Sequence, residues 1–141
     1  MSLNVVNTSR DTKSGRSDVS SLGGAGLLAF ANIAEAWGLS VADQLKLLGI
    51  ASRSTFFKWR RERNPRLPGD TLERLSYLLG IYKSLQILLP DAAAADAWVR
   101  QPNGAAPFGG RSALERMLAG NVSDLNLVRR YLDGVRGGGW S

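Results

Sequence analysis

The chain has 141 residues, of which 44% are hydrophobic and 21% charged, so it can form one compact core and has the composition of a folded globular protein. It lacks cysteine and histidine, which excludes disulfides, thiolate zinc sites and cysteine nucleophiles and removes the commonest general base. We therefore predict no enzyme, no metal site and no cofactor, while the formal net charge of +6 favours a polyanionic partner wherever that charge is concentrated.

Residues 1–22 are polar and are expected to form a flexible N-terminal arm. They are rich in Ser, Asn, Thr and Gly and show no sustained apolar period. The first residues lack the apolar segment of a signal peptide, and no apolar run in the chain approaches the ~20 residues that span a bilayer. A cytoplasmic protein is expected.

Helical spacing of apolar residues predicts four helices in the first half, at about residues 24–37, 41–48, 53–62 and 71–88. Together with their turns they make up a predicted first domain, residues 23–84. Residues 85–141 are predicted to form a second, smaller helical domain.

Capping residues set the expected ends of these helices. Ser40 is predicted to cap the second helix with Gln44 as its capping-box partner, and Ser52 to cap the third. Asp70 is predicted to cap the fourth, paired with Glu73. Each helix should therefore begin directly after its capping residue.

The second half continues the helical pattern. Helices are expected at about residues 92–100, 113–118 and 122–135, the second of them capped by Ser112 with Glu115. A loop rich in Pro and Gly separates the first two, and a flexible glycine-rich end closes the chain. With no strand signal, the predicted fold class is all-α.

The positive charge is concentrated around the third helix. Residues 53–66 contain six basic residues and one acid, so they carry five of the six net charges. A short helix, a turn with Gly49 and a basic helix form the layout of a helix-turn-helix, whose second helix enters the major groove of DNA. Two alternatives stay open, a merely solvated charged helix and RNA binding by the same patch.

Spacing within the third helix separates anchors from contacts. Phe56 and Trp59 lie three residues apart and are expected to hold the helix on the core. Short polar and basic side chains should face DNA, to reach base edges or phosphates. The predicted DNA-binding residues are Arg53, Ser54, Thr55, Lys58, Arg60, Arg61 and Arg63.

Two motifs in the second half carry a resemblance to a known family. Residues 107–120 read PFGGRSALERMLAG, and residues 128–133 read VRRYLD, followed by a glycine-rich end. This segment resembles the toxin-binding domain of Xre/MbcA/ParS antitoxins, in which a helix-turn-helix precedes it. Ala113 departs from the family, which more often has proline there, but alanine is also a good helix former.

The resemblance implies a bacterial type II toxin–antitoxin system. The implied partner is a RES-domain toxin that depletes NAD, with its active-site cleft blocked by the antitoxin's C-terminal domain, and the implied DNA partner is the antitoxin's own operator. A glycine tether ending in Trp140 would suit a cleft, although Trp140 could also fold back on its own core and the arginines could be a solvated face. The predicted toxin-binding residues are Arg111, Arg129, Arg130, Arg136, Trp140 and Ser141.

Two other functions remain as alternatives. A helix-turn-helix repressor without a toxin partner would use the second half for dimerisation or for sensing a ligand in a small apolar pocket. An enzyme acting on nucleic acid would need clustered carboxylates, but the acids are scattered. Because operators are usually bound by symmetric dimers, a homodimer is expected within the complex, with its interface at the 71–88 helix and Trp98.

Overall fold

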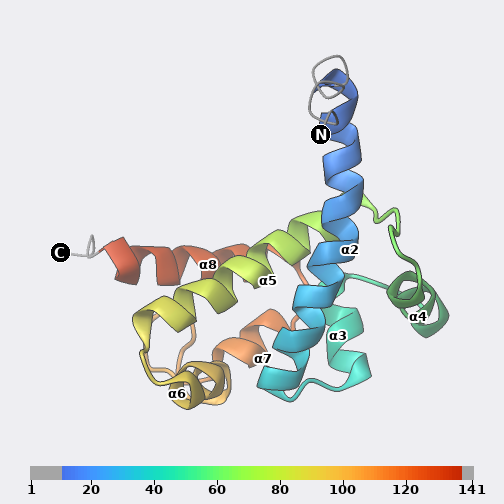
Figure 1. Ribbon diagram of the computed structural model, residues 1–141. Coiled ribbons are helices and arrows are strands. Elements are labelled where there is room, and N and C mark those ends of the chain that lie inside the picture. Colours follow the sequence, from blue (N-terminus) through green and yellow to red (C-terminus); the bar gives the residue numbers. More distant parts are fainter. Residues whose placement is uncertain (1–10, 138–141) are drawn as a thin grey trace.

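The computed structural model describes the backbone of residues 11–137 and the side chains of residues 23–137, and this part of the chain has the predicted all-α fold (Figure 1). None of the described helices is long and apolar enough to cross a membrane. The elements in chain order are α2 (Asp11–Trp37), α3 (Val41–Leu48), α4 (Arg53–Arg61), α5 (Gly69–Leu88), α6 (Ala92–Ala97), the 3₁₀ helix η1 (Trp98–Arg100), α7 (Ala113–Met117) and α8 (Val122–Gly137).

Helix α5 lies at the centre of the molecule. It packs against α2 and α3 on the side of the first domain and against α6 and α8 on the side of the second (Figure 1). Its buried residues Leu75, Leu78, Ile81 and Leu85 are at most 3% exposed. They belong to one hydrophobic core that includes buried residues from both halves of the chain. The predicted boundary between residues 84 and 85 therefore falls inside a continuous helix and a shared core.

Several predicted caps are present as expected. The Ser52 hydroxyl accepts a hydrogen bond from the backbone N–H of Thr55 at 3.2 Å. Ser112 and Glu115 form a reciprocal capping box at the start of α7. These caps fix the starts of α4 and α7 at the predicted residues.

The predicted capping partner of Ser40 was wrong by one residue. Asp43 completes the box, its N–H donating to the Ser40 hydroxyl at 3.0 Å and its carboxylate accepting from the Ser40 N–H at 3.3 Å. Gln44 is instead buried, and its side-chain amide donates to the carbonyl of Leu39. Asp43 stands at the third helical position, where a short carboxylate reaches back to the cap.

The predicted starts of two helices were also wrong. Helix α5 begins at Gly69 with Pro68 as its N-cap, so Asp70 lies in the first turn. There its negative charge interacts favourably with the positive end of the helix dipole. Helix α2 begins at Asp11, so residues 11–22 are helical and not an irregular arm. Once the packed part of α2 has formed, each added turn closes one backbone hydrogen bond per residue, and this extension needs no apolar period. Residues 1–10 lie outside the described part of the chain.

Candidate functional site

The turn between α3 and α4 brings the basic helix to the surface. Gly49 ends α3 with a φ of 69°, a left-handed conformation that glycine adopts without strain. The N–H of Ile50 donates back to the carbonyl of Leu45, and the hydroxyl of Thr71 donates to the carbonyl of Leu48. The end of α3 is thus attached to α5, and α4 leaves the turn in a defined direction.

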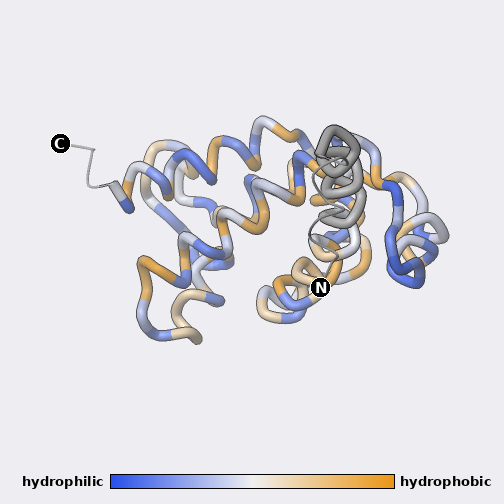
Figure 2. Tube along the Cα trace, turned by 45° about the horizontal axis from the view of Figure 1, so that its top comes forward, coloured by the Kyte–Doolittle hydropathy of each residue, from blue (hydrophilic) through white to orange (hydrophobic). Residues whose placement is uncertain are grey.

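Helix α4 is held by one face and exposed on the other. Phe56 is 1% exposed and Trp59 is half-buried against the core, as predicted for the two anchors. Arg53, Lys58 and Arg61 are exposed. Figure 2 shows hydrophilic residues along much of α4 and the loop that follows, at the right of the molecule. One helix therefore presents a cationic surface from a fixed position.

The remaining predicted DNA-binding residues surround this surface. The hydroxyls of Ser52 and Ser54 lie 2.8 Å apart at the start of α4, next to half-buried Thr55. The guanidinium carbon of Arg60 lies 5.6 Å from the centre of the Phe56 ring, a cation–π contact on the flank of the helix. Arg63 is exposed in the following loop.

Sequence reasoning missed two features of this region. The loop after α4 packs closely on α2, because a Cβ added to Gly24 would lie 2.7 Å from the carbonyl oxygen of Arg63. Phe57 is 37% exposed on α4 and packs edge-on against Phe56. The spacing that predicted Phe56 and Trp59 as anchors leaves Phe57 on another face of the helix, but the sequence analysis gave Phe57 no role.

The second half of the chain is organised around a compact loop and a cluster of aromatic rings. The N–H of Gly110 donates to the carbonyl of Asn103, and the N–H of Asn103 donates to the carbonyl of Arg111. Gly109 and Gly110 both have positive φ angles, 57° and 90°, which allows the chain to reverse at this point. The rings of Trp98 in η1, Phe108 in the loop and Tyr131 in α8 contact one another with centroids 5.2–6.4 Å apart.

The predicted toxin-binding arginines fall into two groups. The guanidinium of Arg129 lies on Gly80 of α5, in the space that a Cβ would occupy, and pairs with Asp133 at 3.1 Å. Arg136 donates to the hydroxyl of buried Ser84, also on α5, at 3.2 Å. Both therefore attach α8 to α5, although Arg136 is itself exposed, as are Arg111 and Arg130. Trp140 and Ser141 lie outside the described residues.

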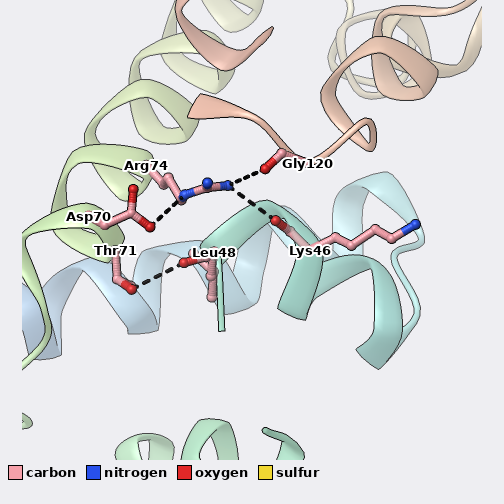
Figure 3. A network of polar contacts seen from close by, with 6 residues as sticks. All are labelled: Lys46, Leu48, Asp70, Thr71, Arg74 and Gly120. Atoms are coloured by element: carbon pink, nitrogen blue, oxygen red, sulfur yellow. Dashed lines mark hydrogen bonds and ion pairs between the residues drawn. The ribbon is translucent and has the colours of Figure 1, made fainter. Parts of the chain in front are cut away.

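Two further arginines connect the halves of the chain. Arg74 on α5 pairs with Asp70 at 2.9 Å and donates to the carbonyls of Lys46, at the end of α3, and Gly120, in the turn before α8 (Figure 3). Arg100 donates to the carbonyls of Trp37 and Gly38 at the end of α2, both at 2.8 Å. These hydrogen bonds join the helix-turn-helix half of the chain to the second half. Helix α4 and the C-terminal end of α8 lie at opposite ends of the molecule (Figure 1).

The predicted dimer interface at the 71–88 helix and Trp98 stays a prediction, and this packing leaves only part of it accessible. Neighbouring helices cover most of α5, and Trp98 is engaged with the internal aromatic cluster. The accessible part of α5 instead lines an apolar groove of about 570 Å³ shared with α2. The residues lining the groove are Ala25, Gly26, Ala29, Leu72, Leu75, Ser76 and Leu79.

Comparison with known proteins identifies both halves. Residues 20–80 match the antitoxin Xre-like helix-turn-helix domain, and residues 84–138 match the antitoxin Xre/MbcA/ParS C-terminal toxin-binding domain. A protein of Sinorhizobium fredii (strain NBRC 101917 / NGR234), "Uncharacterized protein y4oB", is 53% identical over 112 residues, which span 79% of this chain and 84% of that protein. The chain therefore belongs to the Xre-type antitoxins, with a helix-turn-helix domain followed by a toxin-binding domain.

Proposed function

We propose that this antitoxin neutralises a RES-domain toxin by obstructing the toxin's NAD-consuming active site, and that it represses its own operon by binding operator DNA through α4. The observation that carries the DNA-binding role is the exposed set Arg53, Lys58 and Arg61 on a helix anchored by buried Phe56. A recognition helix needs this arrangement to place side chains against base edges while basic groups contact phosphates. The match to a toxin-binding domain supports the proposed neutralisation of a toxin.

We further propose that the operator is bound by a homodimer. Two copies related by a two-fold axis would present two α4 helices to half-sites about 34 Å apart, which is one turn of the DNA duplex. The pseudo-palindromic operator expected for such a dimer should lie upstream of the antitoxin gene.

Co-expression with the product of the neighbouring gene tests the antitoxin role. We expect the two proteins to co-elute and the neighbour to be toxic when expressed alone. Failure of both would overturn the proposal. Deleting residues 137–141 should abolish neutralisation while operator affinity stays unchanged, because the proposed obstruction uses the C-terminal end and α4 lies at the other end of the molecule.

A repressor without a toxin partner is the alternative, and it calls for a small apolar pocket in the second half. The apolar groove lies between α2 and α5, and its lining residues all belong to the first half. Two grooves described in the second half mix apolar residues with charged ones, Arg130 in one and Arg111, Glu115 and Arg116 in the other. This distribution favours the antitoxin.

A further inference from the structure

Two grooves meet at Pro107 on the surface of the toxin-binding domain. One, of about 490 Å³, lies along α8, and the other, of about 420 Å³, lies between α7 and the loop of residues 103–111, which we call the glycine loop. We call their joint lining the Pro107 surface. Its residues are Ala106, Pro107, Phe108, Gly109, Arg111, Glu115, Arg116, Ala119, Ser123, Asn126, Leu127, Arg130 and Tyr131.

The Pro107 surface is held in place by contacts among its own residues and with Asp124. The Nε of Arg116 donates to the carboxylate of Asp124 at 2.9 Å, and its Nη1 donates to the carbonyl of Pro107 at 3.4 Å. This one side chain therefore joins α7, the start of α8 and the glycine loop. The rings of Phe108 and Tyr131, in edge contact at 5.2 Å, support the loop from its inner side. Little rearrangement is needed to bind a partner here.

The charge of the Pro107 surface is positive and available. Arg111 and Arg130 are exposed, and neither forms an ion pair with any residue in the described part of the chain. The one acid in the lining, Glu115, already accepts the N–H of Ser112 in the capping box. The carboxylate of Asp124 is buried and paired with Arg116. An incoming carboxylate would thus meet two arginines that form no ion pair with Glu115, and the lining has three arginines against this one acid.

The surface between these arginines is partly apolar, which distinguishes a protein partner from nucleic acid. Leu127 and Tyr131 line one groove and Phe108 and Ala119 line the other. A phosphate backbone offers nothing to fill such grooves, whereas a polypeptide can place an apolar side chain in each and carboxylates beside the arginines.

We propose that the Pro107 surface is a docking site for an acidic segment of the toxin, separate from the C-terminal end that obstructs the active site. This inference rests on the proposed function. The docking site supplies affinity and electrostatic steering, and residues 137–141 supply inhibition. The two contacts can therefore be removed independently.

The test is the affinity of the full antitoxin for the purified product of the neighbouring gene, measured by calorimetry at several salt concentrations. The double variant Arg111→Glu/Arg130→Glu should bind at least about tenfold more weakly and with a shallower salt dependence than the unmodified chain. The control Lys46→Glu/Lys83→Glu makes the same charge change at exposed lysines of α3 and α5 and should bind within about twofold. Circular dichroism verifies that both variants are folded.

The possible results separate the inference from the proposed function. If the unmodified chain does not bind the toxin, the proposed function fails and the docking site fails with it. If the unmodified chain binds and both double variants bind equally well, the docking site is refuted while the antitoxin role stands. If the Arg111→Glu/Arg130→Glu variant keeps its toxin affinity and loses operator affinity, the surface serves nucleic acid and the inference is also overturned.

Discussion

Gly24 determines how closely the loop after α4 can approach α2. A Cβ at this position would meet the backbone oxygen of Arg63 at 2.7 Å, so an alanine must displace the loop. Overpacking of this kind costs about 1–3 kcal/mol, against a gain of up to about 1 kcal/mol from better helix propensity. We predict that Gly24→Ala lowers the free energy of unfolding by about 1–2 kcal/mol and weakens operator binding.

Chemical denaturation and DNA titration check this prediction. The control is Gly69→Ala in the first turn of α5, where a Cβ meets nothing within 4 Å and φ is not positive. This control should be at least as stable as the unmodified chain. Equal stability of both variants would show that the loop adjusts freely to an added methyl group.

At the residue scale, the sequence predicted local contacts better than distant ones. The caps at Ser52 and Ser112 followed from the residue types within four positions, and both are present. The roles of Arg129 and Arg136 depend on Gly80 and Ser84, which lie about 50 residues earlier in the chain. No local pattern could distinguish these arginines from the exposed Arg130.

At the scale of elements, the outward face of α4 is the proposed operator contact. We predict that the triple variant Arg53→Ala/Lys58→Ala/Arg61→Ala loses specific operator binding while its thermal stability is nearly unchanged, because all three side chains are exposed. Each residue that reads a base edge contributes about 1–3 kcal/mol, and each lost phosphate contact reduces the salt slope by about 1.

Single substitutions assign the type of contact. A base contact affects the operator alone, whereas a phosphate contact weakens binding to all sequences alike. The control Lys83→Ala removes one positive charge near the C-terminal end of α5, as each single substitution does on α4. It should leave the operator affinity close to that of the unmodified chain. Full operator affinity in the triple variant would rule out α4 as the recognition helix.

The existence of each helix could be predicted from its apolar period, but two of the starts could not. The polar residues 11–22 lack the apolar period, yet they continue α2 because its packed part is already helical. At α5, Pro68 has an extended backbone conformation that suits an N-cap without any side-chain bond. Capping rules favour Asp70 over Pro68, and so the prediction was two residues late.

At the scale of the whole molecule, Arg74 connects elements that are distant in the sequence. Its side chain is 11% exposed and supplies donors to the carbonyls of Lys46 and Gly120 (Figure 3). Removing a largely buried donor leaves these carbonyls with one partner fewer, and hydrogen bonds from charged groups contribute about 1.5–3 kcal/mol.

We predict that Arg74→Ala lowers the free energy of unfolding by about 1–3 kcal/mol. Amide hydrogen exchange should accelerate at the end of α3 and in the turn before α8. Arg74→Lys keeps the charge but cannot reach both carbonyls, so its loss should be intermediate. Unchanged exchange in both segments of Arg74→Ala would show that the link does not stabilise the junction.

The two halves of this antitoxin share one core, so neither is expected to fold well alone. Helix α5 packs on α2 with one part of its surface and on α8 with another, and Leu78, Ile81 and Leu85 are at most 1% exposed. Burial of one such side chain contributes about 1.5–3 kcal/mol, so exposing several removes an amount comparable to the whole stability of about 5–15 kcal/mol. A fragment of residues 1–84 lacks α8 and ends within α5.

We therefore predict that the 1–84 fragment is unfolded or aggregated at 25 °C and does not bind the operator. The complete chain should unfold in a single transition, with coincident midpoints for far-ultraviolet circular dichroism and tryptophan fluorescence. Trp37 and Trp98 report on different halves, so single-tryptophan variants can follow each half separately. A cooperatively melting fragment that binds the operator, or separate midpoints for the two tryptophans, would show two independent domains. The DNA-binding helix would then not need the toxin-binding domain for its stability, contrary to what the shared core implies.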